Sequence, residues 1–281
     1  MRGLGIPLAF LLALVPSVIA QDAPLSEGER AWLEENGPLR VALLSDAPPW
    51  AAYDPAHGWS GLDVEAMQLT ALKAGFDVTF VPAATGPEAI ELVENGTVHA
   101  TGSFAARPDL TSFAVRTDSY AEVPFVFFTT DDHPEFQALD DIEGRVSAFP
   151  GSVGEEIIKR SYPHLTYVET GIEVEGVWAL VNGTIDAYAM PVLSGAHLGQ
   201  REGLSEIRPV GDPIFVTPFY FWSHGNQPVV HEILQAGRER ITDTELGVLH
   251  VKWTGYDLRP GPAPTTRLPT WALPAGGLLM V

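Results

Sequence analysis

The chain has 281 residues, 16 Lys and Arg against 36 Asp and Glu, and no cysteine. A formal charge of −20 excludes nucleic-acid binding, which requires a positive surface. The absence of cysteine excludes disulfide scaffolds, thiol catalysis and cysteine zinc sites. An apolar content of 46% with 27 Gly and 24 Pro residues favours a folded, turn-rich α/β protein of one large domain or two ordinary ones.

The first twenty residues are typical of an export signal. Arg2 supplies the positive charge, Ile6 to Val15 the apolar run, and Val18-Ile19-Ala20 the cleavage site. A membrane anchor is the alternative, but the apolar run falls short of the about 20 residues that span a bilayer. We therefore expect residues 1–20 to be a cleaved signal peptide and the mature protein to be periplasmic.

Residues 256–281 are predicted to lie outside the folded part. Arg259 to Arg267 form a Pro-rich linker, and Leu268 to Val281 are apolar. This apolar stretch is also too short to cross a bilayer. Two interpretations stay open, a C-terminal tail or the start of a membrane helix that would tether the protein.

Between the ends, hydrophobic periodicity predicts a β-α-β order that occurs twice. A capping box, Ser26 to Glu29, begins a short helix ahead of the first strand. In the first half we expect strands at 39–44, 76–81 and 97–102 and helices at 64–75 and 87–94. In the second half we expect strands at 142–149, 165–168 and 185–190 and helices at 152–160 and 174–181. An aromatic strand at 219–222 and helices at 229–240 and 242–255 complete the order. Such an order predicts a mostly parallel sheet with helices on its faces.

Several short motifs stand in the order of a known family. They are Leu39-Arg-Val-Ala-Leu with Pro48-Pro-Trp50, Gly61-Leu-Asp-Val-Glu65, Ser103 to Arg107 with Phe113, Gly144-Arg-Val with Gly151-Ser-Val-Gly154, Asn182-Gly-Thr-Ile-Asp-Ala187, and Lys252-Trp-Thr-Gly255. Together they resemble the family 3 periplasmic solute-binding proteins, the polar amino-acid type with the type 2 fold.

The resemblance implies two α/β lobes, each a mostly parallel sheet flanked by helices, with a ligand cleft between them. It implies a discontinuous first lobe, residues 25–130 plus 219–255, and a second lobe, residues 131–218. The hinges are then expected near Thr129-Thr130 and Thr217-Pro218.

The family implies a monomeric, non-enzymatic binder that closes on an amino-acid-like or carboxylate solute and delivers it to the membrane permease of an ABC-type transporter. The opening segment Leu25 to Asn36 also resembles the sensory version of the domain, which precedes a membrane helix in histidine kinases and cyclic-dinucleotide enzymes. A signalling output domain is therefore the alternative partner. No cofactor or metal is expected, since the eight histidines lack metal-ligand spacing. An enzyme is the third interpretation.

Arg107 is the predicted carboxylate partner. A guanidinium offers a bidentate fork to a carboxylate, and the resemblance places the family's carboxylate-binding Arg at this position. Gly102, Ser103 and Phe104 precede it and belong to the same predicted site. The alternative for Arg107 is a surface ion pair with Asp109.

Other candidates lie in loops that come after predicted strands. Ser152 and Gly151 precede a helix whose N-terminus would favour an anion, although Ser152 also begins a capping box with Glu155. Trp50 and Phe104 are candidate aromatic walls, and Asp46 and Tyr53 flank the Trp50 loop. The alternative for Asp46 is a turn residue.

The second lobe departs from the family pattern. The Asp186-Ala187 pair is present, and Asp186 is included among the predicted ligand-binding residues. The family usually places an acid five residues after this Asp to hold the ligand's amine, but Pro191 stands there. Dicarboxylates, peptides and aromatic acids therefore stay open beside amino acids.

Overall fold

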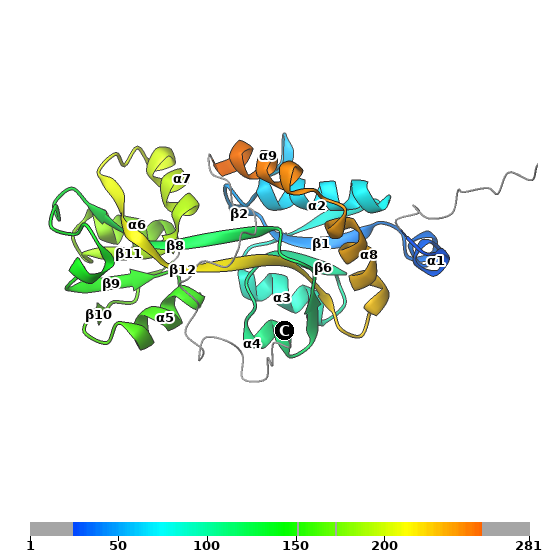
Figure 1. The fold of residues 1–281 in the computed structure, drawn as a ribbon, viewed down its shortest axis with the longest axis horizontal. Helices are drawn as coiled ribbons and strands as arrows, with labels where there is room; N and C mark the ends of the chain where they lie inside the picture. Colours follow the sequence, from blue (N-terminus) through cyan, green and yellow to red (C-terminus); the bar gives the residue numbers. More distant parts are fainter. Residues whose placement is uncertain (1–24, 151, 172, 255–281) are drawn as a thin grey trace, which may run out of the picture.

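One long sheet runs through the computed structural model, which describes residues 25–150, 152–171 and 173–254 (Figure 1). Within those residues the sheet has nine strands in the order β10-β9-β11-β8-β12-β6-β1-β5, and β7 pairs with β12 off this path. Helices gather around its two halves, which form two lobes, and β8 and β12 extend from one lobe to the other. The predicted two-lobed α/β fold is confirmed.

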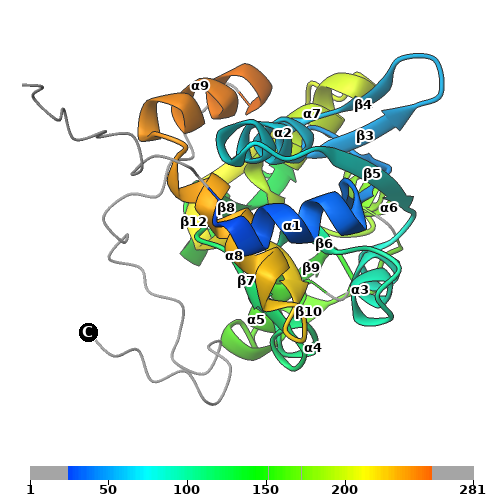
Figure 2. The same ribbon diagram turned by 90° about the vertical axis from the view of Figure 1, so that its right-hand side faces the viewer.

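The first lobe is built on parallel strands. β1 (Leu39–Leu44) is buried between β5 (Val78–Ala83) and β6 (Ala100–Phe104), and its near-continuous apolar sequence fits that central place. The helices and short strands of this lobe are α1 (Glu27–Asn36), β2 (Asp46–Ala47), β3 (Ala51–Asp54), β4 (Gly58–Ser60), α2 (Leu62–Ala74), α3 (Gly86–Glu94), α4 (Pro108–Thr111), β7 (Ala114–Arg116), α8 (Pro228–Glu239) and α9 (Asp243–Thr254). α8 and α9 pack on α2 on one side of the sheet, and α3 packs on β1 and β6 from the other (Figure 2).

The second lobe repeats the order on a smaller scale. β9 (Arg145–Ala148) lies between β10 (Thr166–Tyr167) and β11 (Ala187–Pro191), parallel to both. The 3-10 turn η1 (Leu139–Asp141) and the helices α5 (Val153–Ser161), α6 (Glu173–Val181) and α7 (Val192–Glu202) complete it. α7 begins directly after β11, so the end of that strand fixes where the helix starts.

Two long strands connect the lobes. β8 (Ala121–Thr130) pairs antiparallel with β12 (Ile207–His224), from Ala121 opposite Phe219 to Thr130 opposite Ile207. β8 also pairs with β11 of the second lobe, and β12 with β6 of the first. Every route between the lobes along the sheet therefore passes through these two strands.

The sheet register corrects one expected hinge. Thr217 and Pro218 lie opposite Val123 and Glu122, between the lobes, as a hinge requires. Thr129 and Thr130 lie at the far end of β8, opposite Arg208 and Ile207. The expected hinge at Thr129-Thr130 is therefore wrong, because β8 runs on into the second lobe before it ends.

Candidate functional site

The carboxyl ends of the parallel strands mark where a ligand would bind. In α/β sheets, ligands bind beyond these ends, where the loops leave the strands. β1 and β6 end there in the first lobe, and β9 and β11 end there in the second. Most of the predicted residues lie at or just after these ends, namely Asp46, Trp50 and Tyr53 after β1, Gly102, Ser103, Phe104 and Arg107 at β6, and Ser152 after β9. Gly151 lies outside the described residues.

Trp50 connects the two lobes. Its indole is buried, at 5% exposed, and packs on Phe219 of β12 with 5.1 Å between ring centroids. Its Nε1 donates a hydrogen bond to Ser194 Oγ of α7, at 3.2 Å, and Ser194 is buried too. Trp50 is thus a contact between lobes and not the open aromatic wall that its loop position suggested.

A second contact joins β2 to α7 more loosely. Asp46 Oδ1 lies 4.0 Å from Arg201 Nη1, near the end of α7. The Asp46 side chain is 87% exposed, and exposed pairs of this kind contribute between about 0 and 1 kcal/mol. The buried Trp50–Ser194 contact is therefore the stronger of the two.

Ser103 takes part in a buried polar cluster with Asp63 and Tyr120. The Tyr120 hydroxyl donates to Asp63 Oδ1 at 2.7 Å and accepts from Ser103 N at 2.9 Å. The Ser103 hydroxyl donates to Asp63 Oδ2. Burial raises the pKa of the Asp63 carboxyl to about 6, against the smaller lowering effect of both hydroxyls. Asp63 and Tyr120 were not predicted as site residues.

Gly102 and Phe104 are packed into the first lobe. A Cβ on Gly102 would come within 3.3 Å of the Phe221 and Leu43 side chains, so only a small residue fits without adjustment. Phe104 is 9% exposed, and its carbonyl accepts a hydrogen bond from Trp222 Nε1 at 3.0 Å. The Phe104 ring is therefore core, whereas its backbone borders the loop that carries Arg107.

Arg107 forms an ion pair with Asp109, which was the alternative interpretation of this residue. Its Nε lies 2.7 Å from Asp109 Oδ1, and both side chains are partly exposed. The net contribution of such a pair is small, about 0–1 kcal/mol, so a carboxylate ligand can replace Asp109 at little cost. The predicted ligand contact of Arg107 stays a prediction.

Ser152 caps α5, and Tyr53 lies on a hairpin. Ser152 Oγ accepts a hydrogen bond from Glu155 N at 3.1 Å, which satisfies one amide of the first helical turn. Tyr53 is 45% exposed and packs against Trp59 across β3 and β4, with 5.2 Å between centroids. The role predicted for the α5 N-terminus thus rests on its backbone amides more than on the Ser152 hydroxyl.

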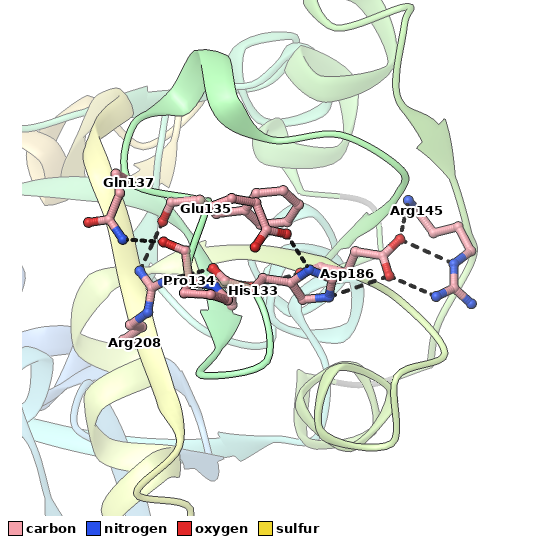
Figure 3. A network of polar contacts seen from close by, with 9 residues as sticks. His133, Pro134, Glu135, Gln137, Arg145, Asp186 and Arg208 are labelled. Carbon is pink, nitrogen blue, oxygen red and sulfur yellow. Dashed lines mark hydrogen bonds and ion pairs between the residues drawn. The ribbon is translucent and has the colours of Figure 1, made fainter.

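Asp186 lies away from the other predicted residues, in a polar network of the second lobe (Figure 3). It accepts hydrogen bonds from Arg145 N and Arg145 Nη2, each at 2.7 Å, and lies 3.8 Å from His133 Nε2. Burial alone would raise its pKa, but the hydrogen bonds from Arg145 outweigh burial and the pKa lies below its usual value. Asp186 precedes β11 and Arg145 begins β9, at the amino ends of these strands and opposite to the edge where a ligand is expected.

A pocket of about 420 Å³ lies beside α7. Phe128, Val192, Leu204, Ser205 and Ile207 are among the residues that line it. None of the predicted site residues borders this pocket, and its lining is mainly apolar. It is therefore separate from the predicted site between the lobes.

The described part of the chain lacks two features. Residues 25–150, 152–171 and 173–254 hold no group of three or more His, Asp or Glu side chains placed to bind a metal ion. No helix in that part of the chain has the length and apolar character needed to span a membrane.

The chain resembles known binding and sensor proteins. Residues 39–256 match the sequence model of the bacterial extracellular solute-binding proteins, family 3. The virulence sensor protein BvgS of Bordetella pertussis is 22% identical over 235 residues, which cover 83% of this chain and 19% of the relative. The chain thus spans about one fifth of the length of this curated relative.

Solved structures give the same fold. The periplasmic VFT2 domain of Bordetella pertussis BvgS is 20% identical, with a TM-score of 0.75 over 81% of this chain and 98% of that one. The ancestral amino acid-binding protein AncCDT-1, a precursor of cyclohexadienyl dehydratase, is 18% identical, with a TM-score of 0.66 over 80% and 98% of the two chains. At these identities the similarity concerns the fold.

Proposed function

Because the chain belongs to the bacterial extracellular solute-binding proteins, family 3, we propose that it binds a small carboxylate or amino-acid-like solute between its lobes, outside the cytoplasm and without chemical conversion. Arg107 binds the carboxylate from the first lobe, and the N-terminus of α5 faces it from the second. The observation that carries this assignment is the Arg107–Asp109 pair, an exposed pair at the carboxyl edge of β6 that a ligand carboxylate can replace.

Trp50 supplies the contact that brings the lobes together. Its side chain already lies against Phe219 and Ser194, so it covers one side of the site when the lobes meet. The backbone of Gly102, Ser103 and Phe104 borders the solute on the first lobe. We leave Tyr53 and Asp186 out of the contact set, because their observed partners lie on the β3–β4 hairpin and at the amino ends of β9 and β11.

The residue at the end of β11 narrows the class of solute. Pro191 stands where the family usually has an acid for the ligand's amine, and it cannot accept a hydrogen bond through its side chain. A solute recognised mainly by its carboxylate is therefore favoured, and blocking its amine should cost little affinity.

A thermal-shift screen with matched pairs of compounds tests this proposal. Each acid is compared with the same compound lacking its carboxylate, such as L-arginine with agmatine, and with its N-acetyl derivative. A ligand at a hundred times its Kd adds about 2.7 kcal/mol to the free energy of unfolding. We expect an acid and its N-acetyl form to stabilise the chain and the decarboxylated analogue to have no effect. Equal stabilisation by the decarboxylated analogue would contradict a carboxylate site.

Solute binding has two candidate roles. The first is delivery of the solute to a transporter, and the second is sensing of the solute. The similarity to the BvgS sensor over 83% of this chain favours sensing. Cell fractionation with an antibody against the chain separates the two roles. A transporter protein would appear in the periplasmic fraction as a free polypeptide, not attached to the membrane. A sensor would appear in the membrane fraction as part of a longer polypeptide.

A further inference from the structure

A buried carboxyl group lies beside the proposed site. Asp63 stands at the start of α2 and is 0% exposed. A carboxylate removed from water must have its oxygens hydrogen-bonded, or its burial is very costly. Here each oxygen accepts from one hydroxyl, Oδ1 from Tyr120 and Oδ2 from Ser103.

The side chain of Asp63 holds a residue in a rare backbone conformation. Ser103 has a φ of +68°, the only positive φ of a residue other than glycine among the described residues. Side chains make this left-handed region unfavourable, so neighbouring groups must hold Ser103 in it. Asp63 binds its hydroxyl, and the hydroxyl of Tyr120 accepts from its backbone N–H at 2.9 Å. Ser103 begins the segment that leads to Arg107.

The backbone of Asp63 holds the loop that carries Trp50. Asp63 N donates to Trp50 O at 2.9 Å, and Leu62 N donates to Pro49 O at 2.9 Å. Gly61 allows this close approach, since a Cβ there would lie 2.2 Å from Trp50 O. The turn that carries Trp50 is therefore attached to the first turn of α2.

The backbone of Tyr120 is held by β12 and α9. Its backbone N donates to Phe219 O at 3.0 Å, and its carbonyl lies 2.8 Å from His250 Nε2 of α9. It stands directly before β8, which connects the lobes. The Asp63 cluster thus touches both predicted loops and the start of a connecting strand.

We propose that Asp63 is a positioning residue of the solute site, whose side chain holds the Ser103–Arg107 segment through Ser103 and Tyr120 and whose backbone holds the Pro48–Trp50 turn. The proposal rests on the proposed function in so far as these two segments face the solute. One buried group then sets the relative position of Arg107 and Trp50, which belong to different loops of the first lobe.

Hydrogen exchange of the ligand-free chain tests this without any solute. The amide of Ser103 is protected by the Tyr120 hydroxyl, so its exchange rate reports directly on the cluster. In Asp63→Ala and in Tyr120→Phe we expect amides of Ser103, Phe104, Ala105 and Ala106 to exchange at least about tenfold faster. Amides of β11 in the second lobe should keep their rates. Asp63→Asn retains one acceptor oxygen, so it should restore part of the protection lost in Asp63→Ala.

Thr70→Ala is the matched control. Thr70 is fully buried in the same helix, and its hydroxyl donates to Ala66 O at 2.8 Å, away from both loops. Thr70→Ala should lower the stability of the chain without selectively accelerating amide exchange at residues 103–106. Unchanged exchange at 103–106 in both cluster variants, or the same acceleration in Thr70→Ala, would overturn the proposal. A failed solute screen would bear on the proposed function and leave this result standing.

Discussion

Trp50 Nε1 donates a hydrogen bond to Ser194 Oγ at 3.2 Å, and this contact joins the first lobe to α7 of the second. Both residues are buried, so the hydrogen bond itself is shielded from water. Also on α7, Arg201 approaches Asp46 only to 4.0 Å. Of these two contacts between the lobes, the buried one made by Trp50 is therefore the stronger.

Removal of the Ser194 hydroxyl should open the lobes. In Ser194→Ala the Trp50 N–H loses its acceptor, and a buried unpaired donor costs about 1–3 kcal/mol in the state where the lobes touch. Because the chain has no cysteine, Glu91→Cys on α3 and Glu156→Cys on α5 accept spin labels at unique sites. We expect the distance distribution between the labels to shift to longer values. Ser112→Ala, whose exposed hydroxyl bonds within its own segment, should leave the distribution unchanged. A distribution insensitive to Ser194→Ala would show that the contact does not hold the lobes.

Asp109 should compete with a ligand for Arg107. In Asp109→Asn the Arg107 guanidinium loses a charged partner, which contributes about 0–1 kcal/mol at an exposed site. We expect the affinity for a carboxylate solute to rise by up to about fivefold, as measured by isothermal titration calorimetry. A marked fall in affinity would mean that the ion pair itself orients Arg107 for binding.

Asp63 should make stability depend on pH between about 4 and 6. Its pKa in the folded state, about 6, lies above the ordinary value of 3.8, so the folded chain binds a proton more tightly than the unfolded chain. The contribution of Asp63 to stability therefore increases as pH falls from 6 to 4 and is flat above this window. In Asp63→Asn this contribution is absent. Urea unfolding of the unaltered chain and of Asp63→Asn at several pH values gives the difference between their free energies of unfolding. We expect this difference to change between pH 4 and 6 and to stay constant from pH 7 to 8. A constant difference from pH 4 to 8 would mean that Asp63 titrates normally.

Two glycines should respond very differently to alanine. Gly61 has a φ of +127°, and a Cβ there would lie 2.2 Å from Trp50 O, so both strain and collision oppose the change. Gly75 has a φ of +80° with nothing within 4 Å of a Cβ, so strain alone of about 1–2 kcal/mol opposes it. Chemical unfolding should therefore show a greater loss for Gly61→Ala than for Gly75→Ala. Similar losses would mean that the Trp50 turn moves aside freely.

The elements that the sequence predicted best are those whose signals lie within a few consecutive residues. β1 occupies the predicted residues 39–44, because a short apolar run between polar turns suits a central parallel strand. The capping box at Ser26 is present as predicted, since its two hydrogen bonds lie within four residues. Such local signals need no knowledge of the rest of the fold.

α7 was missed, and β12 was predicted only over residues 219–222, because tertiary packing overrides their local sequence. Gly195 and Gly199 lower the helix propensity of α7, but the absent side chains admit Phe128 and Ile207, 2.3 and 3.0 Å from the places of their Cβ atoms. β12 passes through Pro209 and Gly211, which usually end strands, by pairing with β8 and shifting its register between Val210 and Phe215. Neither compensation is visible within a short window of sequence.

The polar cluster of the site was missed for a similar reason. Asp63 was recognised as part of a family motif, but its side-chain partners Ser103 and Tyr120 are 40 and 57 residues away. Trp50 was predicted as a site residue from its loop position, whereas its contact with Ser194 spans 144 residues. A residue type and its loop can suggest a site, but the fold decides which side chains meet there.

The effect of Arg107→Ala on ligand-induced stabilisation tests whether Arg107 holds a carboxylate solute between the lobes. Arg160→Ala serves as the control, because Arg160 pairs with Glu156 in the last turn of α5, away from the helix N-terminus. With an acid found in the screen, we predict that Arg107→Ala abolishes the thermal shift and that Arg160→Ala retains it. If Arg107→Ala is folded and shows the full shift, the solute binds elsewhere and the proposed site is wrong.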